Sequence, residues 1–154
     1  MGMVYQTVII CRPNIDTSKL IKFRQLCGLW SQLNGCRSNY KDMGNRQLAY
    51  DIKGYRTGIY YEITWAGIPN NVKVLEQFLR ADPDVLKFLI VKVDDIEDCE
   101  KDTLSPITII ESEKPYIKEK IDRILKGETI SDKDIEIEYE YIDFNELTYL
   151  LDEE

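Results

Sequence analysis

The sequence predicts an α+β fold, with a four-stranded antiparallel sheet and two helices on one of its faces. Over residues 4–93, strand-like and helix-like segments follow one another in the order β-α-β-β-α-β. The two middle strands are joined by a short turn containing glycine, and each of the other connections contains a helix. Right-handed crossovers then give the ferredoxin-like topology. In that topology the first and third strands are central, the second lies at an edge, and one sheet face stays open.

The first strand and the first helix are indicated by residue type and spacing. Residues 4–11 are mostly β-branched or aromatic, and residues 12–14 end the strand at a proline. Residues 16–18 offer helix caps, and apolar side chains then recur at helical spacing as far as Asn34 and Gly35, which end the helix. The side chains expected to face inward are Leu20, Phe23, Leu26, Cys27, Trp30 and Leu33.

A long hairpin follows the first helix. Its first strand covers residues 36–52, with a bulge or bend at residues 43–45, because glycine inside a strand pattern usually marks one. We expect the turn at residues 53–58 and the next strand at residues 59–65.

A second helix and a fourth strand complete the predicted sheet. Residues 66–69 break the strand, Asn70 or Asn71 caps the helix, and Pro83 ends it. Residues 85–93 have strand composition. The helix is amphipathic, with its inward side formed by Val72, Leu75, Phe78 and Leu79.

The charge distribution divides the chain into a body, residues 1–93, and an acidic extension, residues 94–154. The body has 13 Lys and Arg against 7 Asp and Glu, a balance of +6, whereas the extension has 7 against 21, a balance of −14. We expect a short helix at about residues 115–126 and a strand at about residues 134–142, where Ile and Tyr alternate with Glu. The extension has too little apolar surface for its own core, so we expect it to dock on the body or on a partner.

The composition argues against catalysis and against a metal site. Histidine, the commonest general base and metal ligand, is absent. The four cysteines lack the close spacing of zinc or redox motifs. In a sequence without a secretory signal at its start, we expect reduced thiols that lie mostly in the core. No apolar run approaches the roughly 20 residues of a membrane helix. We therefore expect no cofactor, no metal and no membrane partner.

The hairpin and its sheet carry the candidate binding residues. Arg46, Lys53 and Arg56 can neutralise phosphates, and Tyr5 and one of the pair Tyr60 and Tyr61 lie on the adjacent central strands, where they can stack on unpaired RNA bases. The alternative is that the tyrosines are only strand formers and the cations a solvated face. From composition alone the two interpretations are about equal.

A more specific pattern covers residues 4–93. It comprises Gly44, Arg46 and Leu48-Ala49-Tyr50, then Gly58 and Tyr60, then Leu79-Arg80, Asp82 and Val85-Leu86-Lys87, with Tyr5 and Pro13 near the start. In order and spacing these residues resemble the bacterial-type small-subunit ribosomal protein S6 family. The chain departs from the family at Asp51, where proline is usual, at Gln6, where glutamate is usual, and in its extension.

The resemblance implies a non-catalytic structural protein of the small ribosomal subunit. It would bind the central domain of small-subunit rRNA together with a ribosomal protein of the S18 type. The unpaired backbone groups of the edge strand at residues 36–52 could accept such a neighbour. By this analogy the phosphate contacts are Arg46, Lys53, Arg56 and Lys87 and the stacking residues are Tyr5 and Tyr60, with Arg12, Arg80 and Lys92 ranked behind them.

Three interpretations of the extension stay open: it docks on basic ribosomal proteins, it folds back over the open sheet face and competes with RNA, or it is disordered. The docking interpretation is favoured by its charge. The added segment and the two departures favour an organellar ribosome, mitochondrial rather than bacterial.

Two other functions share the predicted topology. One is an RNA-binding module acting outside the ribosome, like an RNA-recognition motif, although the third-strand signature of that motif matches only weakly at Arg56, Gly58 and Tyr60. The other is an acylphosphatase-like enzyme. That chemistry needs a glycine-rich phosphate loop after the first strand, and residues 11–17 contain one arginine, a proline and no glycine.

Overall fold

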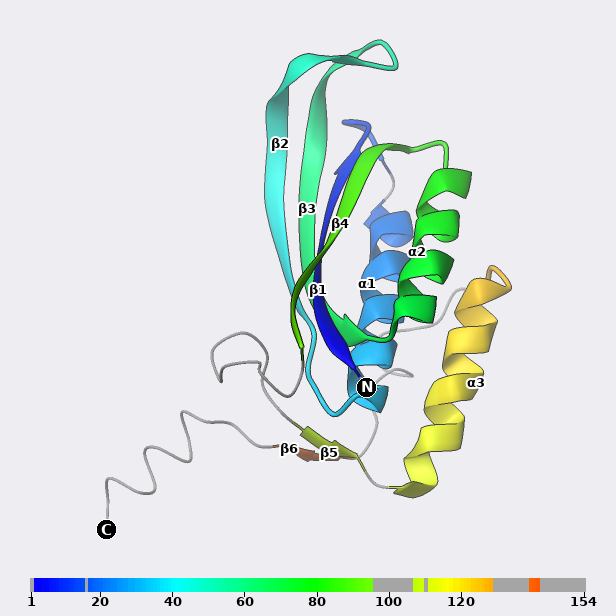
Figure 1. Ribbon diagram of the computed structural model, residues 1–154. Coiled ribbons are helices and arrows are strands. Elements are labelled where there is room, and N and C mark those ends of the chain that lie inside the picture. Colours follow the sequence, from blue (N-terminus) through cyan, green and yellow to red (C-terminus); the bar gives the residue numbers. More distant parts are fainter. Residues whose placement is uncertain (1, 16, 96–106, 110, 129–138, 142–154) are drawn as a thin grey trace.

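The computed structural model describes residues 2–15, 17–95, 107–109, 111–128 and 139–141 (Figure 1). Along the chain the elements are β1 (Met3–Cys11), α1 (Thr17–Leu33), β2 (Asn39–Ile52), β3 (Tyr55–Gly67), α2 (Pro69–Ala81), β4 (Val85–Asp95), β5 (Ile107–Ile109), the short 3₁₀ helix η1 (Glu111–Glu113), α3 (Lys114–Leu125) and β6 (Tyr139–Tyr141).

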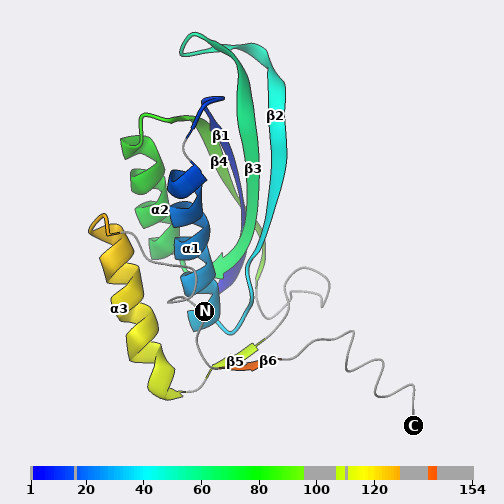
Figure 2. The ribbon, with the colours of Figure 1, turned by 180° about the vertical axis from the view of Figure 1, so that it is seen from behind.

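The main sheet has the strand order β2-β3-β1-β4, with every neighbouring pair antiparallel. Both α1 and α2 lie on the same face of this sheet, and α3 lies beside them on the side away from the strands (Figures 1 and 2). The predicted fold class is confirmed, including the central positions of β1 and β3 and the edge position of β2. The sheet face away from the helices is the open face.

The core fills the space between the sheet and the helices. Trp65 of β3 is fully buried there, with its ring centroid 5.0 Å from that of Tyr5 and 5.4 Å from that of Trp30. The indole Nε1–H of Trp65 donates a hydrogen bond to Thr7 Oγ1 at 2.9 Å, which satisfies both groups without water. The predicted inward residues of both helices all belong to this cluster or pack against it.

The second helix begins earlier than the sequence pattern suggests. Pro69 occupies its first turn and Ile68 precedes it, so the expected break at residues 66–69 ends sooner. Proline suits this position because its fixed φ matches the helix and its missing N–H is not needed there. Asn71 is not the residue that precedes the helix, because it lies within the first turn. Its Oδ1 atom accepts a hydrogen bond from the backbone N–H of Ile68 at 2.9 Å.

The hairpin is longer, and its turn shorter, than the prediction of residues 53–58. Ile52 pairs with Tyr55, so the loop contains only Lys53 and Gly54, with φ values of 51° and 86°. Two consecutive positive φ values are typical of a type I′ turn, whose twist matches that of paired strands. The predicted bulge is confirmed, because the register of β2 and β3 shifts between Asp42 and Gly44, and Gly44 has a φ of 78°.

Part of the extension packs on the body. The side chains of Ile117, Ile121 and Ile124 on α3 are buried in the same apolar cluster as the sheet and helices, and α3 lies against α1. Of the strand expected at residues 134–142, only β6 is described, where it pairs with β5. The remainder lies outside the described residues. The division of the chain at residue 93 stays a prediction. Within the described residues, no helix is long and apolar enough to cross a membrane.

Candidate nucleic-acid interface

Strand alternation determines which side chains lie on the open face. On β1, Tyr5, Thr7, Ile9 and Cys11 are buried toward the helices, so Gln6, Val8 and Ile10 point the other way. Residues that pair directly across two strands share a face. Because Ile10 pairs with Tyr60 of β3 and with Lys87 of β4, both of these side chains lie on the open face.

The same reasoning adds two arginines from the hairpin. Arg56 and Gly58 alternate with Tyr60 along β3, and Arg46 of β2 pairs with Gly58. Four predicted binding residues, Arg46, Arg56, Tyr60 and Lys87, therefore lie on one face, and we call them the basic cluster. Three unit positive charges and one partly exposed aromatic ring thus share a surface without helices.

Gly58 allows close packing at the centre of this region. A Cβ atom at this position would lie 2.8 Å from Ile10 Cγ2 and 3.0 Å from the backbone oxygen of Cys11. Leu48 of β2 is also near, with its Cδ2 atom 3.6 Å from that point. The absence of a side chain lets Ile10 and Leu48 cover the backbone of β3. The surface between the cations is therefore apolar at this point.

Tyr50 is a site residue that the sequence analysis did not select. It is 60% exposed, and its hydroxyl oxygen accepts a hydrogen bond from Lys87 Nζ at 2.8 Å. This hydrogen bond raises the pKa of the Lys87 ammonium group above its ordinary value of 10.5, because it favours the charged form. Strand alternation could have identified Tyr50 from the sequence, since Arg46, Leu48 and Tyr50 lie on the same side of β2.

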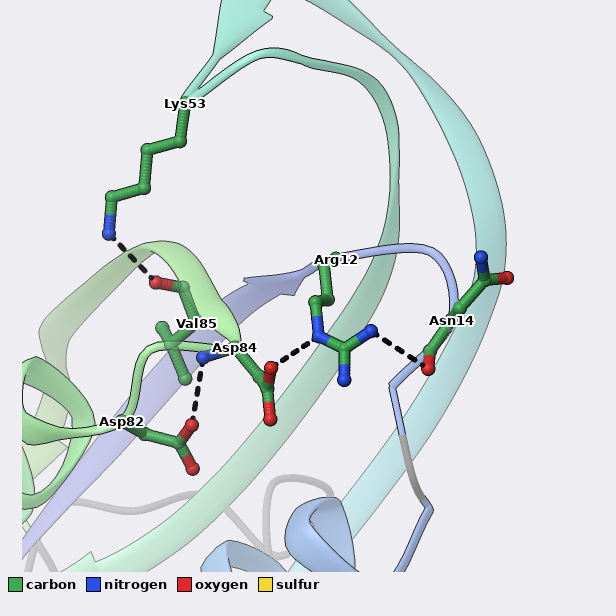
Figure 3. A network of polar contacts seen from close by, with 6 residues as sticks. All are labelled: Arg12, Asn14, Lys53, Asp82, Asp84 and Val85. Carbon is green, nitrogen blue, oxygen red and sulfur yellow. Dashed lines mark hydrogen bonds and ion pairs between the residues drawn. The ribbon is translucent and has the colours of Figure 1, made fainter.

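The other cations of the hairpin differ in how they are held. Arg46 Nε donates to the backbone oxygen of Met43 at 3.2 Å. Lys53 Nζ donates to the backbone oxygen of Val85 at 3.3 Å, as Figure 3 shows. Lys53 thereby connects the hairpin turn to the start of β4. Arg56 is exposed and forms no ion pair or hydrogen bond with the described part of the chain.

The assignment of Tyr5 as a stacking residue is wrong. Its side chain is only 6% exposed and packs on Trp65 beneath the helices. The error comes from the composition of β1, in which both alternating sets contain apolar residues, so the sequence does not show which set faces the core. The pair Tyr60 and Tyr61 is also resolved: Tyr61 is buried on the helix side, where it stacks on Tyr40, and Tyr60 lies on the open face.

Arg12, a lower-ranked candidate, has a structural role. Its guanidinium forms an ion pair with the buried carboxylate of Asp84, and its Nη1 atom donates to the backbone oxygen of Asn14 at 3.1 Å (Figure 3). The hydrogen bond to Asp84 raises the pKa of Arg12 above its ordinary value. These contacts join the loop after β1 to the loop before β4.

The two remaining candidates do not lie on the open face. Arg80 pairs with Glu76 one turn earlier on α2. Lys92 pairs in register with Tyr5, which points toward the helices. Within the described residues, no group of three or more Cys, Asp or Glu side chains could hold a metal ion.

Comparisons with known proteins agree with this fold. The family model described as ribosomal protein S6 matches residues 4–92. Small ribosomal subunit protein bS6 of Helicobacter acinonychis (strain Sheeba) is 31% identical over 100 residues, covering 62% of this chain and 68% of the relative. The protein bS6c of Gracilaria tenuistipitata var. liui is 33% identical over 89 residues, covering 57% of this chain and 86% of the relative.

A solved structure shows the same fold. The crystal structure of 30S ribosomal protein S6 from Thermotoga maritima superposes with a TM-score of 0.50 at 21% identity, and the match covers 60% of this chain and 89% of that one. The family match covers more than half of the present sequence. The chain therefore belongs to the ribosomal protein S6 family, a non-enzymatic structural component of the small ribosomal subunit.

Proposed function

We propose that this protein binds small-subunit rRNA through its open sheet face, using the basic cluster together with Tyr50 and Lys53. The observation that carries the proposal is the position of Arg46, Arg56 and Lys87 around Tyr60 on the face that α1 and α2 leave uncovered. Exposed cations neutralise backbone phosphates, and an exposed ring can stack on an unpaired base. Family membership excludes the acylphosphatase-like alternative.

The proposal also includes the RNA target, the partner proteins and the compartment of the ribosome. The RNA target is the central domain of small-subunit rRNA, and the neighbouring protein is of the S18 type. The acidic extension docks on basic ribosomal proteins, as its −14 balance favours. The ribosome is organellar, and mitochondrial rather than bacterial, because of the extension and the departures at Gln6 and Asp51.

Sedimentation of the tagged full chain tests this function. Lysates of whole cells and of isolated organelles are run on gradients before and after a high-salt wash. We expect the protein to co-sediment with small subunits, and the lysate that contains it identifies the compartment. A chain that stays at the top of the gradient but binds short single-stranded RNA would instead be a module acting outside the ribosome.

A matched pair of triple variants tests the open face. Changing Arg46, Arg56 and Lys87 to Glu reverses the charge of the basic cluster. The control changes Lys73, Lys118 and Lys126 to Glu, which alters the net charge equally on exposed positions of α2 and at α3. We expect the first variant to leave the small-subunit fraction and the control to remain in it. Equal retention of both would refute the assignment of RNA binding to the open face.

A further inference from the structure

The two edges of the main sheet differ in how readily they accept another strand. β2 is interrupted by the bulge at Gly44, and the exposed side chains around it are polar or charged, including Asn45 and Gln47. Bulges and charges are the devices by which natural proteins prevent pairing at an edge. The β2 edge, which the sequence analysis assigned to a neighbouring protein, is therefore protected along this part.

β4 lacks these devices between Lys87 and Lys92, and its register with β1 shifts only beyond the two ends of this stretch. Among the described strands only β1 pairs with it, so the backbone groups on its outer edge have no strand partner there. Four consecutive apolar residues, Phe88 to Val91, separate Lys87 from Lys92. Leu89 and Val91 point to the open face and are 59% and 45% exposed. Contiguous apolar exposure beside unpaired backbone groups is typical of a strand-addition site.

The helix side of this edge is hollow. A groove of about 520 Å³ runs between α2 and β4. Val72 and Leu79 of α2 form one apolar wall, and Phe88 and Ile90 of β4 form the other. A strand added to β4 would direct alternate side chains into this groove and over Leu89 and Val91, so both of its faces need apolar residues.

The charges around the groove favour an acidic partner. Lys53, Arg80 and Lys87 line it with a single carboxylate, that of Glu76, which is paired with Arg80, so Lys53 and Lys87 supply the net positive charge. A second copy of this chain would bring the same cations of its own β4 against them, which is unfavourable. RNA has no apolar side chains for the groove and no backbone N–H or C=O groups to pair with a strand edge.

We propose that the outer edge of β4, from Lys87 to Val91, is a docking edge for a β-strand of another small-subunit protein, apolar along its length and acidic at its flanks. The proposal rests on the proposed function for the identity of the assembly. It shares Lys53 and Lys87 with the proposed RNA-binding surface, but the features that carry it are the groove, Leu89 and Val91.

Site-specific cross-linking in purified small subunits tests this proposal. The full chain carries photoreactive p-benzoylphenylalanine in place of Leu89, and the control carries it in place of Asn45 on β2. After irradiation, mass spectrometry identifies the cross-linked chain. We expect position 89, but not position 45, to cross-link to a segment of another ribosomal protein with apolar residues and acidic flanks. Cross-links from position 89 to rRNA, to residues 142–154 of the same chain or to nothing would overturn the proposal.

A pair of double variants measures the contribution of the edge. Leu89→Ser with Val91→Ser removes the apolar side chains without changing the charge of the open face, and Asn45→Ser with Gln47→Ser makes matched neutral changes on β2. Loss of two such burials should weaken retention in washed subunits by at least about tenfold in the first variant only. Equal retention of the two variants overturns the docking edge. Absence of the wild-type chain from small subunits is a different result, which overturns the proposed function itself.

Discussion

The packing of α3 on the body can be tested at Ile124, whose side chain is fully buried against the core. Ile124→Ala removes three carbon groups, which at about 0.8 kcal/mol each gives roughly 2.4 kcal/mol of lost transfer free energy. The cavity that remains raises the expected loss to about 3 kcal/mol. For a chain of this length, that corresponds to a Tm lower by about 6–12 °C.

The assay is urea unfolding of the full chain followed by circular dichroism, with thermal scans in parallel. The matched control is Leu125→Ala at the next position, where the side chain is 36% exposed and should cost under about 1 kcal/mol. If the two variants have the same free energy of unfolding, α3 does not pack on the body in solution. The burial of Ile117, Ile121 and Ile124 against the body would then be wrong.

Three further predictions concern the core and the sheet. Thr7→Val leaves the Trp65 indole N–H without an acceptor and should lower the free energy of unfolding by about 1–3 kcal/mol, whereas Thr7→Ser should be milder, as urea midpoints will show. Gly58→Ala places a methyl group against Ile10 and should cost about 1–3 kcal/mol, and an unchanged midpoint would contradict the close approach. Burial, helped by two nearby aspartates, raises the pKa of Cys11 from 9.0 to about 12, so its thiol stays protonated in the folded state while the unfolded thiol ionises. Stability should therefore fall between pH 9 and 12, and the slope should be smaller in Cys11→Ala by about 1.4 kcal/mol per pH unit.

The sequence predicted the order of the elements because each has a clear period or composition. The amphipathic helices could be placed by the spacing of Phe23, Trp30 and Leu75, since burial requires one apolar side. For β1, the sequence could not predict which alternate side chains face the helices, because both sets of this central strand contain apolar residues. Tyr5 was assigned to the wrong face for that reason. Which of Tyr60 and Tyr61 lies on the open face could be decided only from the pairing of β3 with β1.

The rest of the site depended on contacts between distant segments. Three of its cations were identified from the hairpin alone, because Arg46, Lys53 and Arg56 lie close together in sequence. The partnership of Lys87 with Tyr50 joins residues 37 positions apart on opposite edge strands. It requires the two-residue turn at Lys53 and Gly54, which the composition of residues 53–58 did not specify.

The hydrogen bonds of the hairpin cations have a consequence for the entropy of binding. Before any ligand arrives, Arg46 is already held by the backbone of Met43, Lys53 by that of Val85, and Lys87 by the hydroxyl of Tyr50. Fixing a long side chain at an interface ordinarily costs about 0.5–1.5 kcal/mol. These three cations therefore lose less rotational freedom when they contact a ligand. Arg56 keeps its freedom and can adjust its side chain to the shape of the target.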